Sequence, residues 1–202
     1  MKSKLPNSRK RVVLVVPYDE EWQVQFEQIR DLLATYLGSL ILSIEHVGST
    51  SVPGLAAKPI LDIDVIIRSR DDLDETINEL SKLGYDHKGD LGIVGREAFS
   101  RRGEKVPWDG TGYVWQTLHH LYVCAQTSGE LVRHLIFRDY LREHPLDVSE
   151  YAEVKITAAS NHRQDIEGYM AEKAECIEKI HCKAKVVENE VVQYLDSLGK
   201  GK

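Results

Sequence analysis

Two aspartates in an apolar run are the residues of this chain best suited to chemistry. Asp62 and Asp64 lie in I-L-D-I-D-V-I-I, residues 60–67. On a strand both side chains leave the same face, with Cα atoms roughly 6.5 Å apart. Two neighbouring carboxylates repel each other and are costly to remove from water. Mg²⁺ or Mn²⁺ removes that cost by taking carboxylate oxygens together with phosphate oxygens. We therefore expect Asp62 and Asp64 to be metal ligands and catalytic residues.

A turn rich in glycine and hydroxyl side chains precedes the aspartates. It reads G-S-T-S over residues 48–51. Backbone N–H groups and hydroxyls in such turns hold phosphate, so we expect Gly48, Ser49 and Thr50 to bind the phosphates of a nucleotide. Lys58, where the chain returns to the aspartates, either reaches a phosphate or is solvated. An isolated Asp-x-Asp is more often a strand edge or a turn cap, and the preceding turn is what favours a metal and triphosphate site.

These two features together carry a resemblance. Gly-Ser, a short connection and Asp-x-Asp on an apolar strand are similar to the signature of the nucleotidyltransferase superfamily that includes DNA polymerase beta. The string E-H-V-G-S-T-S-V-P-G-L-A-A-K-P-I-L-D-I-D-V-I-I resembles the GrpB family, as do P-Y-D-E-E-W-Q-V-Q-F and H-L-I-F-R-D-Y-L-R-E-H-P elsewhere in the chain. The similarity covers about residues 11–180. It implies an α+β fold, with a nucleotidyltransferase-like mixed sheet of about five strands, flanking helices and a C-terminal helical extension.

Hydrophobic patterning gives the elements that must position these residues. Apolar runs predict strands at 12–16, 41–47, 60–67 and 118–125, with shorter ones after Tyr85 and within 92–102. Helical spacing predicts helices at 20–36, 71–83, from Thr127 or Ser128 to His144, at 146–159, and from Asp165 to about Leu198. We expect the helices 20–36 and 71–83 on one side of the sheet. The predicted domains are a core of residues 11–126 and a C-terminal helical region of residues 127–198, packed on the core or extending it.

One strand departs from the family pattern. GrpB-like proteins typically read H-H-L-H-V where this chain has His119-His120-Leu121-Tyr122-Val123. Working nucleotidyltransferases usually place a third carboxylate on the matching strand, and a missing ligand leaves fewer fixed positions for a second ion. We assign His120 to acceptor contact, weak metal ligation or general base catalysis. The alternative is a hydrogen-bonded histidine at a strand end.

Positive charge for a nucleotide comes from the C-terminal helices. Arg138 lies in the F-R-D-Y-L-R motif, and Lys155 and Lys173 each follow a tyrosine by four residues, as in the family's Y-x-x-x-K. Residues four apart share one helix face, so Tyr169 and Lys173 can project together toward a nucleotide. We predict that Arg138, Lys155, Tyr169 and Lys173 bind phosphate or nucleotide. In the alternative arrangement each tyrosine packs against a neighbour and its lysine is in water.

Composition excludes several classes. The chain has 202 residues, a net charge of −6 and three cysteines without metal-ligand spacing. Such a charge argues against non-specific nucleic-acid binding, and cysteine usage favours a reduced, cytoplasmic protein. We expect no transmembrane helix, because the chain lacks an apolar run of about 18 residues. The basic segment 1–11 lacks the apolar region of a signal peptide. Oligomerisation through the C-terminal helix is possible on this pattern.

Three functional classes fit these residues. The first is a Mg-dependent nucleotidyltransferase that moves a nucleoside monophosphate from an NTP to a small-molecule or protein acceptor. The second is a nucleotide- or phosphate-binding accessory module without transferase activity, which the missing third carboxylate favours. Domains resembling GrpB also occur fused to dephospho-CoA kinase, which suits such an accessory role. The third class is a metal-dependent phosphohydrolase or phosphotransferase.

Overall fold

A mixed five-stranded sheet forms the centre of the protein. The computed structural model describes residues 12–200, so the basic segment 1–11 and the predicted domain start at residue 11 lie outside the described residues. The strands are β1 (Ile41–Val47), β2 (Ile60–Ile67), β3 (Tyr85–His87), β4 (Glu97–Arg101) and β5 (Leu118–Ala125). Their order is β1-β2-β5-β4-β3, and only β2 and β5 run parallel. The predicted α+β fold with five strands is confirmed.

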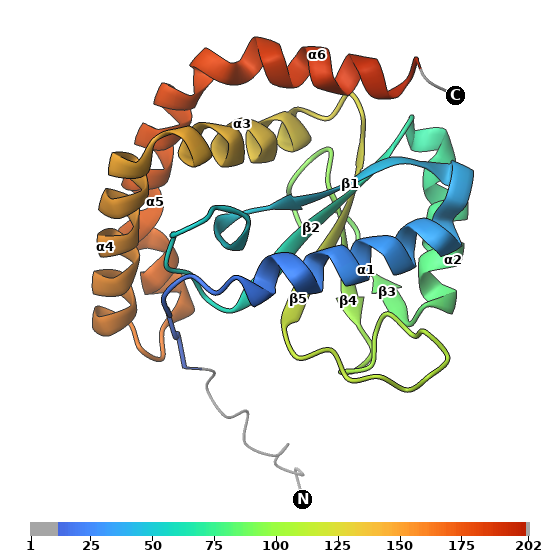
Figure 1. The fold of residues 1–202 in the computed structure, drawn as a ribbon, viewed down its shortest axis with the longest axis horizontal. Helices are drawn as coiled ribbons and strands as arrows, with labels where there is room; N and C mark the ends of the chain where they lie inside the picture. Colours follow the sequence, from blue (N-terminus) through green and yellow to red (C-terminus); the bar gives the residue numbers. More distant parts are fainter. Residues whose placement is uncertain (1–11, 201–202) are drawn as a thin grey trace, which may run out of the picture.

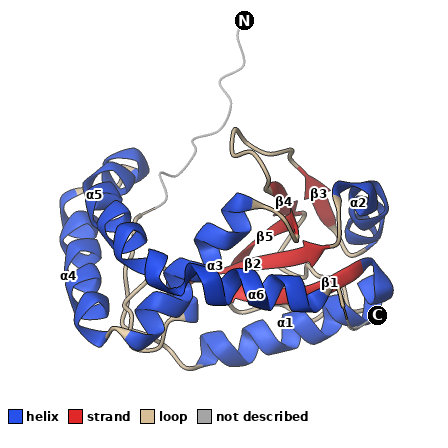
Figure 2. Cartoon of the chain, turned by 90° about the horizontal axis from the view of Figure 1, so that it is seen from above, coloured by secondary structure: helices blue, strands red, loops and turns tan. Residues whose placement is uncertain are grey.

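Helices cover both faces of this sheet. They are α1 (Glu21–Leu37), α2 (Leu73–Lys82), α3 (Gly129–Glu143), α4 (Pro145–Asn161), α5 (Ile166–Ala184) and α6 (Glu188–Leu198). Figure 1 shows α1 on one side of the sheet and α3 with α6 on the other. The apolar spacing of α1 and α2 places both helices against the same face, as expected. Figure 2 shows α4 and α5 side by side beyond the sheet rather than over it.

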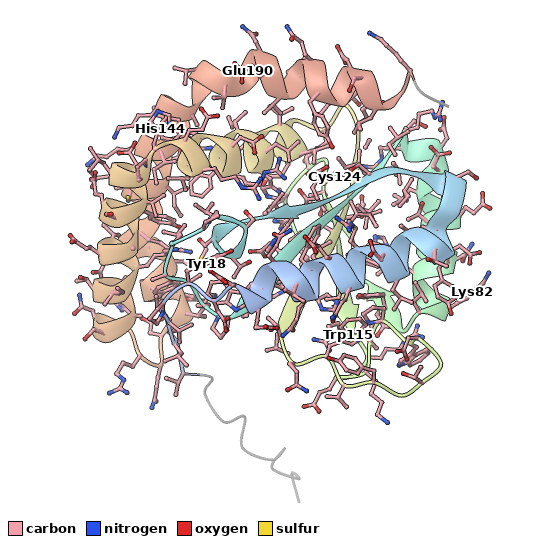
Figure 3. The ribbon with its side chains drawn as sticks, in the orientation of Figure 1. Tyr18, Lys82, Trp115, Cys124, His144 and Glu190 are labelled. Carbon is pink, nitrogen blue, oxygen red and sulfur yellow. The ribbon has the colours of Figure 1, made fainter. Side chains whose placement is uncertain are left out.

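Side-chain alternation along β2 divides the core in two. Leu61 and Ile63 point to the α1 side and join its buried cluster. Ile66 points to the α3 side and packs in a second cluster with Cys124 of β5 and Leu135 of α3. Figure 3 labels Cys124 in this layer, between the sheet and that helix. Asp62 and Asp64 share the α3 side with Ile66, because strand side chains alternate. The aspartates therefore face the C-terminal helices.

Two of the predicted elements are wrong. Residues 12–16 form only an isolated bridge between Val16 and Ala57, because the partners of this segment are single loop positions and not a free sheet edge. The predicted helix from Asp165 to Leu198 is interrupted at Lys185–Val187. The interruption lets α6 lie along α3, where Val191 and Leu195 are buried in the second cluster.

The connection from the sheet to the C-terminal helices is short. Ser128 caps α3 by accepting a hydrogen bond from the Leu131 N–H, which fixes the helix start directly after β5. Pro145 then occupies the first turn of α4, a position that suits proline. The helices after residue 126 thus share a core with the sheet. Among residues 12–200 the structure contains no helix long and apolar enough to span a membrane.

Candidate functional site

The parallel pairing of β2 with β5 sets the register of the site. Asp62 lies opposite His120, and Asp64 lies opposite Tyr122. Asp64 is fully buried, and its Oδ2 accepts a hydrogen bond of 2.7 Å from Nδ1 of His134 on α3. Its Oδ1 has no hydrogen-bond partner within the described structure. The two carboxylates thus have different surroundings, because Asp62 is only partly buried.

His134 is a cation held between two carboxylates. Its Nε2 lies 3.3 Å from Glu130 Oε1, one helical turn earlier on α3. Burial lowers the pKa of His134, but the Asp64 and Glu130 carboxylates outweigh that effect and raise the pKa to about 10. The imidazole is therefore protonated at neutral pH and neutralises Asp64. Burial raises the pKa of Asp62, and the nearby Asp64 charge adds to this, while His120, His134 and Lys58 oppose it.

The glycine turn lies directly against Asp62. Gly48 has φ +68°, and an added Cβ would collide with the Asp62 carboxylate, 3.0 Å from its Cγ. Both the backbone conformation and the close approach therefore require glycine. Ser51 Oγ donates to the Gly48 carbonyl at 2.7 Å, and Arg142 Nη2 donates to the Ser51 carbonyl at 2.9 Å. The turn is thus fixed from both sides. Thr50 is buried, with its hydroxyl 3.0 Å from His46 Nε2.

A cavity of about 230 Å³ opens between this turn and the α4–α5 pair. The predicted site residues that line it are Ser49, Thr50, Lys58, Asp62, His120, Lys155, Tyr169 and Lys173. A second hollow of about 190 Å³ shares Ser49, Asp62 and Lys173 with it, and also contacts Gly48, His134 and Tyr151. Asp62 therefore lies where the two hollows meet. These residues come from positions far apart in the sequence and converge on one space.

The two Tyr–Lys pairs do project together. Lys155 Nζ lies 4.4 Å from the centroid of the Tyr151 ring, and Lys173 Nζ lies 4.8 Å from that of Tyr169. Lys58 Nζ lies 5.5 Å from the same Tyr169 ring. The alternative, with each lysine in water, is wrong for Lys155, whose exposed fraction is 1%. Amino groups from three segments thus line one cavity.

These amines differ in charge. Burial, with the nearby Lys173, lowers the pKa of Lys155 to about 6. Burial, with Lys58, lowers the pKa of Lys173 to about 8, and Asp62 opposes that shift. Lys155 Nζ has no hydrogen-bond partner among residues 12–200, so its charged form has little to replace the lost water. Lys155 is largely neutral at pH 7, whereas Lys173 is largely charged.

Arg138 lies away from this cluster. Its buried guanidinium donates to Glu45 Oε2 at 2.7 Å and to Asp139 Oδ1 at 2.6 Å. Its Nη1 also donates to the His46 carbonyl. These bonds point the side chain to β1 and its own helix rather than to the cavity. The position of Arg138 therefore supports a structural role and not the predicted phosphate contact.

Sequence reasoning missed two residues of the site. His134 begins the stretch H-L-I-F-R-D-Y-L-R-E-H-P and follows Glu130 by one helical turn, a spacing that places the two side chains together. Tyr151 is hydrogen-bonded to Ser49 and so connects α4 to the glycine turn. Its signal was the Y-x-x-x-K spacing, which pointed to the lysine and not to the tyrosine itself.

Known proteins are similar to this chain in sequence and in fold. Residues 12–183 match the family described as GrpB protein. The chain belongs to the GrpB family. The UPF0157 protein YqkA of Bacillus subtilis is 36% identical over 87% of the chain, and the match spans 48% of YqkA. The crystal structure of conserved protein GrpB from Enterococcus faecalis is 34% identical, covers 85% of this chain and 96% of that one, and superposes with a TM-score of 0.72.

A further relative of this GrpB-family chain is longer. The dephospho-CoA kinase of Mycolicibacterium paratuberculosis is 29% identical over 80% of the chain, and the match spans 43% of that kinase. The chain thus spans less than half the length of both YqkA and the kinase. The matched sequence therefore also occurs within longer proteins.

The donor set bears on the divalent ion that the sequence predicts. Residues 12–200 contain no group of three or more His, Cys, Asp or Glu side chains placed to hold a metal ion. Asp62 and the unpartnered Oδ1 of Asp64 are nevertheless two hard oxygen donors on one strand, and the glycine turn lies against Asp62. Mg²⁺ commonly takes one or two carboxylates and completes its shell with water and phosphate. The residues therefore fit an ion that arrives with a phosphate ligand.

Proposed function

We propose that this GrpB-family protein transfers a nucleoside monophosphate from an NTP, bound with Mg²⁺ or Mn²⁺, to a small-molecule or protein acceptor. The observation that carries the proposal is the single cavity on which Asp62, the glycine turn and three lysines converge. The Asp62 carboxylate, suited to an ion, and lysine amines, suited to an anion, line the same cavity. A metal–triphosphate complex has both charges and would complement both kinds of side chain.

Each residue has a distinct part in this proposal. Asp62 and Asp64 Oδ1 would hold the ion, which supplies charge neutralisation for the phosphate oxygens and the leaving pyrophosphate. The backbone of Gly48 and the hydroxyl of Ser49 orient the β- and γ-phosphates. Lys58 and Lys173 supply positive charge in the same cavity. Tyr169, between these two lysines, holds their amines over its ring.

His120 has the position suited to the acceptor side. It faces Asp62 across the parallel strand pair and lines the same cavity. An imidazole there can accept a proton from an acceptor group. Among the described residues no carboxylate accepts a hydrogen bond from His120, in contrast to His134. The ring nitrogens of His120 therefore remain available for that proton exchange.

A second function is favoured by one observation. Opposite Asp62 and Asp64, β5 presents His120 and Tyr122, where transferases of this superfamily usually carry a third carboxylate. A protein with two carboxylates can bind a metal–nucleotide without activating an acceptor hydroxyl. The match within a dephospho-CoA kinase suits this alternative, a nucleotide- or phosphate-binding module without transferase activity.

The decisive experiment uses Asp62→Asn with Mg-ATP and Mg-GTP. The substitution removes one of two repelling charges, so the metal-free protein should become more stable by about 0.5–1 kcal/mol. The nucleotide-induced rise in Tm should fall to near zero, because the ion loses a ligand. Stability and binding therefore move in opposite directions. Asp196→Asn, on the exposed side of α6, is the matched control and should leave both unchanged.

Three results are separable in the same samples. Loss of stability in Asp62→Asn with an unchanged nucleotide shift contradicts a metal–nucleotide site. A shift in the parent together with pyrophosphate release supports the transferase. A shift without pyrophosphate release, whatever acceptor is offered, supports the binding module. The proposal includes an NTP as the ligand, and it includes no nucleic-acid or membrane partner. Oligomerisation through the C-terminal helix stays a prediction.

A further inference from the structure

Lys155 is the most unusual ionisable group of the cavity. Its side chain is 1% exposed, its Nζ has no hydrogen-bond partner in the described part of the chain, and it lines the cavity with Ser49 and Asp62. A lysine buried only for packing usually directs its amine to water or to a carboxylate. Here the side chain borders the cavity where a nucleotide is proposed to bind, and its enclosed amine has no other partner among the described residues.

The surroundings of Lys155 come from two helices. On α4, one turn earlier, the Tyr151 ring lies 4.4 Å from Nζ. On α5, the like charge of Lys173 lowers the pKa of Lys155, and the Cys176 thiol raises it by a smaller amount. Burial and a second cation are the two conditions that make a lysine amine a neutral nucleophile at ordinary pH. With its pKa lowered to about 6, the amine keeps its lone pair at pH 7.

The strand opposite the aspartates shows why such a nucleophile matters. An acceptor hydroxyl must lose a proton to attack, and a second metal ion held by a third carboxylate commonly assists that loss. This chain has His120 and Tyr122 at the facing positions. A neutral amine needs no such assistance, because its lone pair is already free. The missing carboxylate and the unpartnered amine are thus complementary features of one site.

We propose that Lys155 is a catalytic residue that accepts the nucleoside monophosphate from the NTP and forms a covalent lysyl-phosphoramidate intermediate. This inference rests on the proposed transferase function and names its first acceptor. The lone pair of Nζ attacks the α-phosphorus, and an N–P bond forms. The bond from the α-phosphorus to the bridging oxygen breaks, and pyrophosphate leaves with that electron pair. The nitrogen then gives one proton to His120.

A second step completes the transfer. An acceptor hydroxyl or amine attacks the same phosphorus, the N–P bond breaks, and Lys155 regains a proton while the acceptor loses one. The nucleotidyl group thus passes through the protein in two displacements, and pyrophosphate leaves before the final acceptor binds. A protein lacking an acceptor should therefore accumulate the intermediate.

The experiment incubates the full chain with Mg-ATP and no acceptor, followed by intact-mass measurement. We expect a mass increase of one adenylyl group and release of one equivalent of pyrophosphate. Peptide mapping should place the group on Lys155. The linkage should survive alkali and be lost in acid, as a P–N bond is. Adduct formation should also slow as pH falls from 8 to 5, because the amine becomes protonated.

Two variants keep the test informative. Lys155→Met removes the amine and should abolish the adduct. Lys155→Arg places a cation without a free lone pair at this position, so it should bind Mg-ATP, measured by calorimetry, and also form no adduct. Lys179→Met on exposed α5 surface should form the adduct as the parent does. Nucleotide binding by the parent without any adduct overturns the role of Lys155 but leaves the nucleotide site. Absence of both binding and adduct overturns the proposed function itself.

Discussion

Two buried basic side chains, Arg138 on α3 and Lys155 on α4, have opposite surroundings. Arg138 is 7% exposed and donates to two carboxylates and a carbonyl. Lys155 is 1% exposed and has no hydrogen-bond partner among the described residues. A buried charge that is fully bonded holds elements together, whereas a buried amine without partners lowers stability unless a ligand supplies them. The contrast separates a structural basic side chain, Arg138, from a functional one, Lys155.

Arg138→Met gives the largest effect on the structural side of this comparison. It leaves Glu45 buried without its 2.7 Å partner, although the Tyr194 hydroxyl still donates to Glu45. We expect a loss of about 3–5 kcal/mol in the free energy of unfolding, measured by urea denaturation. The double variant Arg138→Met with Glu45→Gln removes the stranded charge and should recover part of the loss. A single variant as stable as the parent would show that the buried ion pair contributes nothing.

His134→Gln extends the comparison to a third basic side chain. His134 has carboxylate partners, and it changes charge within the pH range of the experiment. The pKa of His134 is raised from 6.5 to about 10 in the folded state. A raised pKa contributes stability that is fully present below the unfolded value and lost as pH rises through the folded one. The parent should therefore exceed His134→Gln by about 2–3 kcal/mol at pH 6. The difference in stability, measured by chemical denaturation, should shrink toward zero at pH 10. A difference that does not depend on pH would contradict a charged pair of His134 and Asp64.

The local parts of this site were predictable from sequence, and the long-range parts were not. The turn at Gly48 and the alternation of Asp62 and Asp64 depend on neighbours in the chain. The bond between His134 and Asp64 joins residues 70 apart and depends on how α3 packs on the sheet. In the same way, the F-R-D-Y-L-R motif does not reveal that Arg138 turns to Glu45. Motif membership gave residue types but not the direction of each side chain.

Hydrophobic patterning predicted the wrong element where tertiary packing determines the local structure. The apolar run at residues 12–16 has strand composition, but only Val16 finds a bridge partner. The helical pattern continues through Lys185–Val187, yet the chain bends there so that Leu195 reaches the α3 side of the core. Tertiary contacts override local propensity in both places.

Lys155→Met gives a smaller stability effect than Arg138→Met or His134→Gln, and the effect has the opposite sign. Methionine keeps much of the side-chain length and has no amine that must lose its proton on folding, so the metal-free variant should be about 1–2 kcal/mol more stable than the parent at pH 7. The folded pKa is lowered from 10.5 to about 6. Between these values the unfolded chain holds a proton at this site that the folded chain lacks, so parental stability rises with pH.

The gap between Lys155→Met and the parent should therefore be widest below pH 6 and close toward pH 10.5. Thermal and urea unfolding across this pH range measure the gap in stability. The control is Lys179→Met, which changes an exposed lysine and should stay within about 0.5 kcal/mol of the parent throughout. Mg-ATP should also narrow the gap, because the nucleotide stabilises only the chain that can bind it fully. A Lys155→Met variant less stable than the parent would mean that the amine has a partner in the protein. Lys155 would then belong with Arg138 as a structural cation.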